Sequence, residues 1–141
     1  MACEDLDIAL IIGKAIKTFN KDLIYVVLPI TKMEKAAKKI DIKYACEIFA
    51  DRNYQENAQL VERRHPNAII KDPLICVKNI MEMLESSSIK SLNGTRIKCK
   101  IDSICVHGDG DNSLQIAKLI KKKLINNGFT TVNLDNMSKF K

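Results

Sequence analysis

Three short runs of apolar, largely β-branched residues constrain the fold of this chain more than any other feature. They occupy residues 23–28, 42–49 and 101–106, with helix-like segments between them. Such runs are typical of strands in a parallel sheet, where helical crossovers join one strand to the next. We therefore expect an α/β fold made of parallel βαβ units. The run 23–28 lacks polar alternation, so we expect its strand to be buried on both faces and to end at Pro29, which cannot continue the hydrogen-bond ladder.

Capping residues and helix breakers predict four helices around these runs. Asp5 and Thr31 can each cap a helix, and Asp72-Pro73 combines a cap with proline at the first helical position. Gly128 ends the last helix, because glycine readily adopts the backbone angles that terminate one. The four predicted helices cover residues 5–19, 31–39, 72–84 and 112–127.

Two connections differ in character from the rest of the chain. Asn93-Gly94 lies between short alternating stretches, which predicts a β-hairpin. Residues 50–70 are polar and show no clear periodicity. Connections of that length inside a compact domain are usually functional or disordered.

The length of 141 residues is that of one ordinary domain. We expect this domain to cover residues 1–129 and to be followed by a basic, loosely ordered tail over residues 130–141. Three main strands are few for a free-standing sheet. They suit a flavodoxin-like module and an arc of a (β/α) barrel equally well.

The formal net charge is +6, and much of it comes from lysine clusters on predicted helix faces. Such a chain can bind nucleic acid through phosphates. Aromatic residues make up only 5% and tryptophan is absent, so no base-stacking platform is indicated, and nucleic acid is an unfavoured partner. A small basic α/β binding or assembly module without catalytic activity remains the alternative hypothesis.

The cysteines and the N-terminus bear on location. The five cysteines are an odd number and form no CxxC pair, so neither a disulfide framework nor a zinc site is indicated. No apolar run is long enough to span a membrane, and the first residues are acidic where a signal peptide is basic. We therefore expect a cytoplasmic protein that does not associate with membranes.

The candidate functional residues follow predicted strands. In (β/α) folds, chemistry gathers where strands end and the loops to the next helix begin. Asp51 and Arg52 follow one strand, and His107 and Asp109 follow another. A histidine can transfer protons near neutral pH when a carboxylate orients it, and an arginine can hold a pair of carboxylate or phosphate oxygens.

Structural explanations of the same residues stay open at this point. Asp109 can simply cap the next helix, and Asp51 and Arg52 can form a local ion pair of small energetic value. Gly108 and Gly110 precede a helix, as in phosphate-binding loops, but they have neither the spacing of a P-loop nor that of a dinucleotide fingerprint.

Two segments carry a more specific signal. Residues 47–54 read EIFADRNY and are followed by LVERRHPNAII over residues 60–70, and residues 102–109 read DSICVHGD. In sequence and spacing these segments resemble the EVFADRxY, LVxRxxPGAVI and SICVHGD motifs of the LamB/YcsF family. The resemblance extends from about Asp5 to Gly128.

The resemblance implies a fold and a function. It implies an irregular (β/α) barrel of the glycoside hydrolase/deacetylase type, and the A component of ATP-dependent 5-oxoprolinase, which converts 5-oxo-L-proline to L-glutamate. It also implies B and C components as partners and ATP, with Mg²⁺, as cofactor. On this basis we predict His107, Asp109 and Asp51 as catalytic residues, Arg52 as a substrate-binding residue and no metal site within the chain.

The sequence also departs from the family pattern. The family's N-terminal DLNADLGEG, CGFHAGD, GAHP and KPHGALY segments have no counterpart here. We therefore expect the chain to correspond to the C-terminal portion of the barrel, truncated or split, and to be inactive alone. A separately encoded N-terminal piece is a further expected partner.

Overall fold

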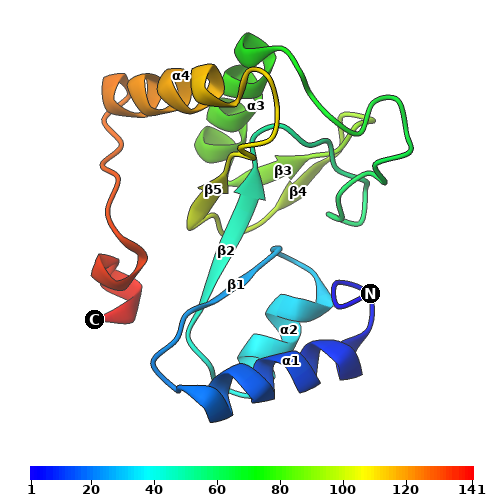
Figure 1. Cartoon of the computed structure of the whole chain (residues 1–141), viewed down its shortest axis with the longest axis vertical. Coiled ribbons are helices and arrows are strands. Elements are labelled where there is room, and N and C mark those ends of the chain that lie inside the picture. Colours follow the sequence, from blue (N-terminus) through cyan, green and yellow to red (C-terminus); the bar gives the residue numbers. More distant parts are fainter.

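The computed structural model describes residues 1–141 and contains a parallel sheet of three strands in the order β1–β2–β5 (Figure 1). The strands are β1 (Tyr25–Val27), β2 (Tyr44–Phe49) and β5 (Ser103–Cys105). Val27 lies opposite Cys46 in the first pairing, and Phe49 lies opposite Cys105 in the second. The predicted α/β fold with a parallel sheet is confirmed, and β2 is its central strand.

Four helices flank the strands in two pairs: α1 (Leu6–Phe19) with α2 (Lys32–Lys39), and α3 (Pro73–Ser86) with α4 (Ser113–Asn126). In Figure 1 the first pair lies at one end of β2 and the second pair near its other end. Asp5 and Asp72 cap α1 and α3 as predicted, because a carboxylate oxygen of each accepts hydrogen bonds from two backbone N–H groups of the first turn.

The start of α2 differs from the prediction. Thr31 occupies the N-cap position, but its hydroxyl donates to the Leu28 carbonyl at 2.7 Å and caps nothing. The Glu34 carboxylate instead accepts from the Ile30 backbone N–H at 2.6 Å. Ile30 has φ 65°, in the left-handed region that residues other than glycine rarely adopt.

The prediction that the first strand is buried on both faces was wrong. Tyr25 and Val27 are buried, whereas Val26 between them is 38% exposed. Successive side chains of a strand point to opposite faces, and β1 is an edge strand with one face packed against α2. The unbroken apolar run therefore does not mean two covered faces here.

The core consists of two clusters that meet along β2. The smaller surrounds Tyr25, Ala37 and Cys46, between β1 and α2. The larger contains Ile48 of β2 together with residues of α3, α4 and the β-hairpin. The carboxyl end of β2 thus rests on the larger cluster, which fixes the position of the loop that follows it.

The β-hairpin is confirmed by β3 (Ser88–Lys90) and β4 (Arg96–Lys98), which pair antiparallel. Gly94 has φ 87° in its turn, a value that glycine adopts without steric cost. The long connection 50–70 is tied back on itself, because Arg52 pairs with Ile69 and Tyr54 with Leu60.

The C-terminal tail, for which we expect loose order, contains two short 3-10 helices, η1 (Leu134–Asn136) and η2 (Ser138–Phe140). The Lys139 ammonium lies 2.6 Å from the Asp102 carboxylate and 5.0 Å from the centre of the Tyr44 ring. The tail therefore contacts the sheet through an ion pair and a cation–π interaction. No helix of the chain has the length and apolar character required to cross a membrane.

Candidate functional site

His107 and Asp51 lie side by side beyond the carboxyl ends of β5 and β2. Because Phe49 and Cys105 are register partners, the residues two positions further along each chain emerge at the same edge of the sheet. The imidazole Nδ1 of His107 is 2.8 Å from each carboxylate oxygen of Asp51. The Phe49 ring stacks on the imidazole with 5.4 Å between centroids and 29° between planes. Strand pairing, a hydrogen bond and ring stacking thus hold the histidine in one orientation.

This pairing determines what the imidazole can do chemically. A carboxylate can only accept hydrogen bonds, so the Nδ1 of His107 carries the proton that it shares with Asp51. In the neutral ring Nε2 then has the free lone pair and is the atom that can take up a proton. A negative charge beside Nδ1 also stabilises the imidazolium that forms. The pair is therefore equipped for general acid–base chemistry.

A cavity of about 250 Å³ opens beside the pair. All four residues predicted from the sequence, Asp51, Arg52, His107 and Asp109, line it. Asp109 is exposed and is not the cap of α4, since Asn112 holds that position and its side-chain amide donates to the Lys71 carbonyl at 3.1 Å. The explanation of Asp109 as a helix cap was wrong, and its carboxylate is free to face the cavity.

Arg52 has a different environment from the one expected. It is 7% exposed, and its Nε and Nη2 donate to the carbonyls of Ala68 and Val61 at 3.3 and 2.7 Å. It forms no ion pair with Asp51, so that alternative was wrong as well. Burial lowers the pKa of the Arg52 guanidinium, and the nearby positive charge of Arg63 lowers it further. Two of its five N–H donors thus hold the 52–70 loop in place.

Several residues of the site were missed by sequence reasoning. Arg63, Lys71, Asp111 and Asn112 also line the cavity. Arg63 belongs to the long connection without periodicity and Lys71 directly follows it, so no strand or helix pattern indicated where their side chains would lie. The one signal available was Arg63 itself, which falls inside the LVERRHPNAII segment.

Tyr54 is a buried residue of the long connection that contacts the end of β2 next to the site. It is 1% exposed, and its hydroxyl accepts the Phe49 backbone N–H at 2.7 Å. Burial raises the pKa of the Tyr54 hydroxyl, although the Phe49 hydrogen bond opposes this. This contact joins the loop to the end of β2, next to the ring that stacks on His107.

The family resemblance implies ATP with Mg²⁺, and two features of this chain bear on that expectation. No three His, Cys, Asp or Glu side chains are grouped so that they could hold a metal ion. The glycine segment that resembles a phosphate loop is closed on itself, because the Gly110 N–H donates to the Ser113 hydroxyl at 3.0 Å.

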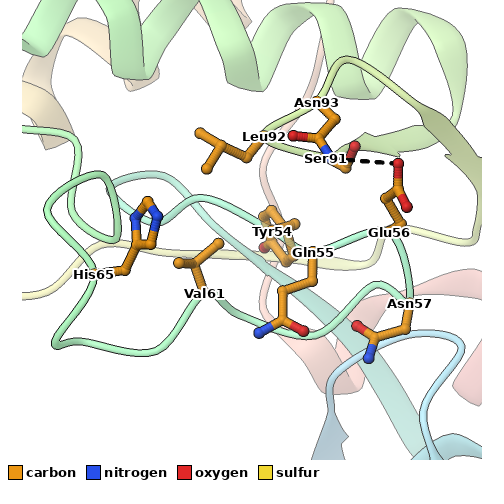
Figure 2. A pocket seen from close by; sticks show the side chains of 9 residues that line it. All are labelled: Tyr54, Gln55, Glu56, Asn57, Val61, His65, Ser91, Leu92 and Asn93. Atoms are coloured by element: carbon orange, nitrogen blue, oxygen red, sulfur yellow. Dashed lines mark hydrogen bonds between the residues drawn. The ribbon is translucent and has the colours of Figure 1, made fainter.

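A second, larger hollow of about 420 Å³ lies along the same loop and is lined by Tyr54, Val61 and His65 among others (Figure 2). Figure 2 shows Glu56 reaching toward the hairpin, where its carboxylate accepts hydrogen bonds from Asn93 and Thr95. The Nδ1 of His65 accepts the Asn67 backbone N–H at 3.1 Å and has no carboxylate partner. This hollow lies between the loop and the hairpin, and no carboxylate is paired with a histidine in it.

Comparisons with known proteins show which family and which proteins this chain is similar to. The family model described as LamB/YcsF family matches residues 1–139. The 5-oxoprolinase A subunit from Campylobacter jejuni subsp. doylei is 40% identical over 124 residues, which are 88% of this chain and 49% of that protein. The 5-oxoprolinase A subunit from Nitrobacter hamburgensis is 34% identical over 128 residues, 91% of this chain and 50% of that protein. The chain spans about half the length of the curated relatives it matches.

A solved structure is also similar. The crystal structure of a lactam utilization protein from Thermus thermophilus superposes with a TM-score of 0.80 at 29% identity, over 92% of this chain and 51% of that one. The segments on which the sequence resemblance rested form part of the cavity wall, and Lys71 and residues 110–116 contribute the rest. On the match of the family model and the identity to these relatives, the chain belongs to the LamB/YcsF family.

Proposed function

We propose that this chain supplies the acid–base half of the active site of an ATP-dependent 5-oxoprolinase A component, a hydrolase that opens the lactam of 5-oxo-L-proline to give L-glutamate. The observation that carries the proposal is the His107–Asp51 pair, held at 2.8 Å at the edge of a cavity that Asp109 also lines. The names of the relatives supply the reaction.

The proposed chemistry follows from the tautomer of His107. The partner components place a phosphoryl group from ATP on the lactam oxygen. Water then attacks the ring carbon that carries this oxygen while Nε2 of His107 takes a proton from the water, so that a C–O bond forms as the C=N π bond opens. Collapse of the tetrahedral species breaks the ring C–N bond, and the leaving nitrogen takes the proton back from the imidazolium. A second water hydrolyses the resulting acyl phosphate, which releases inorganic phosphate and the carboxylate of L-glutamate. Asp51 keeps the imidazole oriented and stabilises its charged form, and Asp109 is the second group at the cavity that can exchange a proton.

Activation of the lactam by ATP with Mg²⁺ is assigned to the B and C components, because this chain has no grouped metal ligands and no phosphate loop of its own. A cytoplasmic location is part of the same proposal.

We also propose that the chain is the C-terminal portion of an irregular (β/α) barrel. Two observations support this: β1 and β5 are edges with no further strand beyond them, and the matched relatives are about twice as long. An unpaired strand edge presents N–H and C=O groups that another strand can bind. A separately encoded N-terminal piece is the proposed occupant, and without it we expect the chain to be inactive.

The test is reconstitution. The chain is combined with an N-terminal half taken from a full-length relative and with B and C components, and ATP-dependent release of L-glutamate from 5-oxoproline is measured. We expect turnover by the assembly, none by the chain alone, and a loss of roughly 10²- to 10⁴-fold in kcat for His107→Gln.

His65→Gln is the matched control, because it changes the other histidine of the chain, which lies in the second hollow. It should leave turnover close to that of the unmodified assembly. Equal activity of the His107→Gln and His65→Gln assemblies would contradict the proposed role of His107, and an inactive unmodified assembly would remove the proposed function.

A further inference from the structure

Three cationic side chains line the cavity next to His107, and they are not equivalent. Arg52 is engaged with the carbonyls of Val61 and Ala68. Arg63 and Lys71 form no ion pair with any carboxylate of the chain within 4.0 Å, although Asp109 and Asp111 line the same cavity. Two positive charges at the cavity are therefore without a partner in the protein.

The backbone on both sides of Arg63 is fixed. The Val61 N–H donates to the Asn53 carbonyl at 2.9 Å, and the Val61 carbonyl accepts from Arg52 at 2.7 Å. Two residues further along, the His65 N–H donates to the Glu62 carbonyl at 2.9 Å. Arg63 thus lies on a closed turn whose position at the cavity is set by Arg52, so little ordering is required of its backbone when a ligand binds.

The guanidinium groups of Arg52 and Arg63 line the same cavity. The charge of Arg63 is one of the causes that lower the pKa of Arg52. Like charges at a partly buried site repel, and this repulsion is relieved when an anion binds between or beside them. A guanidinium offers two parallel N–H donors that match the two oxygens of a carboxylate.

We propose that Arg63 is the residue that binds the carboxylate of the small-molecule ligand in this cavity, with Lys71 as a second cation and Arg52 as the positioning residue that holds the loop. This rests on the proposed function in that the carboxylate is the one shared by 5-oxoproline and glutamate. It moves the anion-binding role from Arg52, to which we assigned it from the sequence, to a residue eleven positions further along.

The acidic groups of the cavity narrow the class of ligand. Lining residues come from two stretches of chain: residues 51–71 contribute Arg63 and Lys71 together with Asp51, which is paired with His107, and residues 107–116 contribute Asp109 and Asp111. A ligand with negative charge throughout would be repelled by the second stretch. A molecule with a carboxylate at one end and an N–H donor at the other satisfies both, as a cyclic or free amino acid does.

The test measures binding by calorimetry, with the reconstituted assembly in the absence of ATP. We expect 5-oxo-L-proline to bind and Arg63→Gln to weaken it by about 10- to 100-fold, the usual effect of losing a charge-assisted bidentate contact. The ligand 2-pyrrolidinone has the same ring without the carboxylate, and its affinity should not change in Arg63→Gln. Arg64→Gln is the matched control, because Arg64 is exposed like its neighbour Arg63 but does not line the cavity.

Three results would overturn the inference: 5-oxoproline affinity unchanged in Arg63→Gln, an equal loss in Arg64→Gln, or inorganic phosphate as the only ligand whose binding depends on Arg63. The last would make the site one for the phosphoryl group. If binding of 5-oxoproline depends on Arg63 while the unmodified assembly shows no ATP-dependent release of L-glutamate, the carboxylate site stands and the proposed function fails. The two ideas are thus tested separately.

Discussion

Removing the hydroxyl oxygen from each of two buried tyrosines should affect stability differently: Tyr54→Phe should destabilise the protein, and Tyr25→Phe should not. Tyr54 and Tyr25 are 1% and 6% exposed, and phenylalanine can replace either ring without leaving a cavity. The Tyr54 hydroxyl accepts the Phe49 N–H at 2.7 Å, whereas the Tyr25 hydroxyl is the only buried side-chain nitrogen or oxygen of the chain without a hydrogen-bond partner.

The magnitude follows from these environments. Tyr54→Phe leaves the Phe49 N–H without its acceptor, which costs about 1–3 kcal/mol. Unfolding entropy of roughly 2.1 cal/mol/K per residue gives a chain of this size about 0.3 kcal/mol/K, so Tm should fall by about 3–10 °C. Tyr25→Phe removes a desolvated hydroxyl that gains nothing in return, so the free energy of unfolding should stay the same or rise by up to about 1 kcal/mol.

The assay is thermal and urea unfolding of the wild type and both variants at one protein concentration, followed by circular dichroism. Tyr44→Phe is a further control, because the Tyr44 ring keeps its cation–π contact with Lys139 after the hydroxyl is removed. A Tyr54→Phe variant as stable as the wild type, or a Tyr25→Phe variant that loses as much as Tyr54→Phe, would refute this account of how the loop is joined to β2.

Three other perturbations have expected outcomes. Asp51→Asn keeps the shape of the side chain but removes the charge beside Nδ1 of His107. The kcat of the reconstituted assembly should therefore fall by about 10²- to 10⁴-fold with little change in KM, and a change in KM alone would contradict an orienting role. A hydrogen bond from Lys90, with Lys78 and Arg96 nearby, lowers the pKa of Glu82 below its usual 4.5. The stability that this carboxylate contributes is therefore present above that value and lost as pH falls through the lower, folded-state pKa. Glu82→Gln should destabilise by at most about 1 kcal/mol at neutral pH and converge with the wild type in acid, as followed by urea unfolding across pH. Burial raises the pKa of the Cys76 thiol to about 11 and that of Cys46 to about 12. Both thiols should therefore react slowly with a disulfide reagent near about pH 8 in the native protein and quickly in guanidinium chloride. A fast native-state reaction that disappears in Cys76→Ser would contradict the burial of Cys76, whereas one that persists in this variant would come from other thiols.

The sequence alone was sufficient for the main helices and strands and for the place of the candidate residues at strand ends. Apolar runs, capping aspartates and an Asn-Gly turn act within a few residues, so the strands, helices and hairpin could be located from local patterns. The pairing of Asp51 with His107 came only from the tertiary structure, which makes β2 and β5 neighbours and brings their carboxyl ends to one edge.

The tertiary structure decided the roles of the charged residues in the long connection. Arg52 binds carbonyls 9 and 16 residues away in the chain, and Arg63 reaches the cavity only because that loop folds back on itself. Neither contact produces a periodic pattern in the sequence, and an arginine in the sequence does not show whether its guanidinium is buried or exposed. Likewise, an apolar run could not show that one face of β1 is left uncovered, because exposure depends on which element packs against the strand and not on the strand itself.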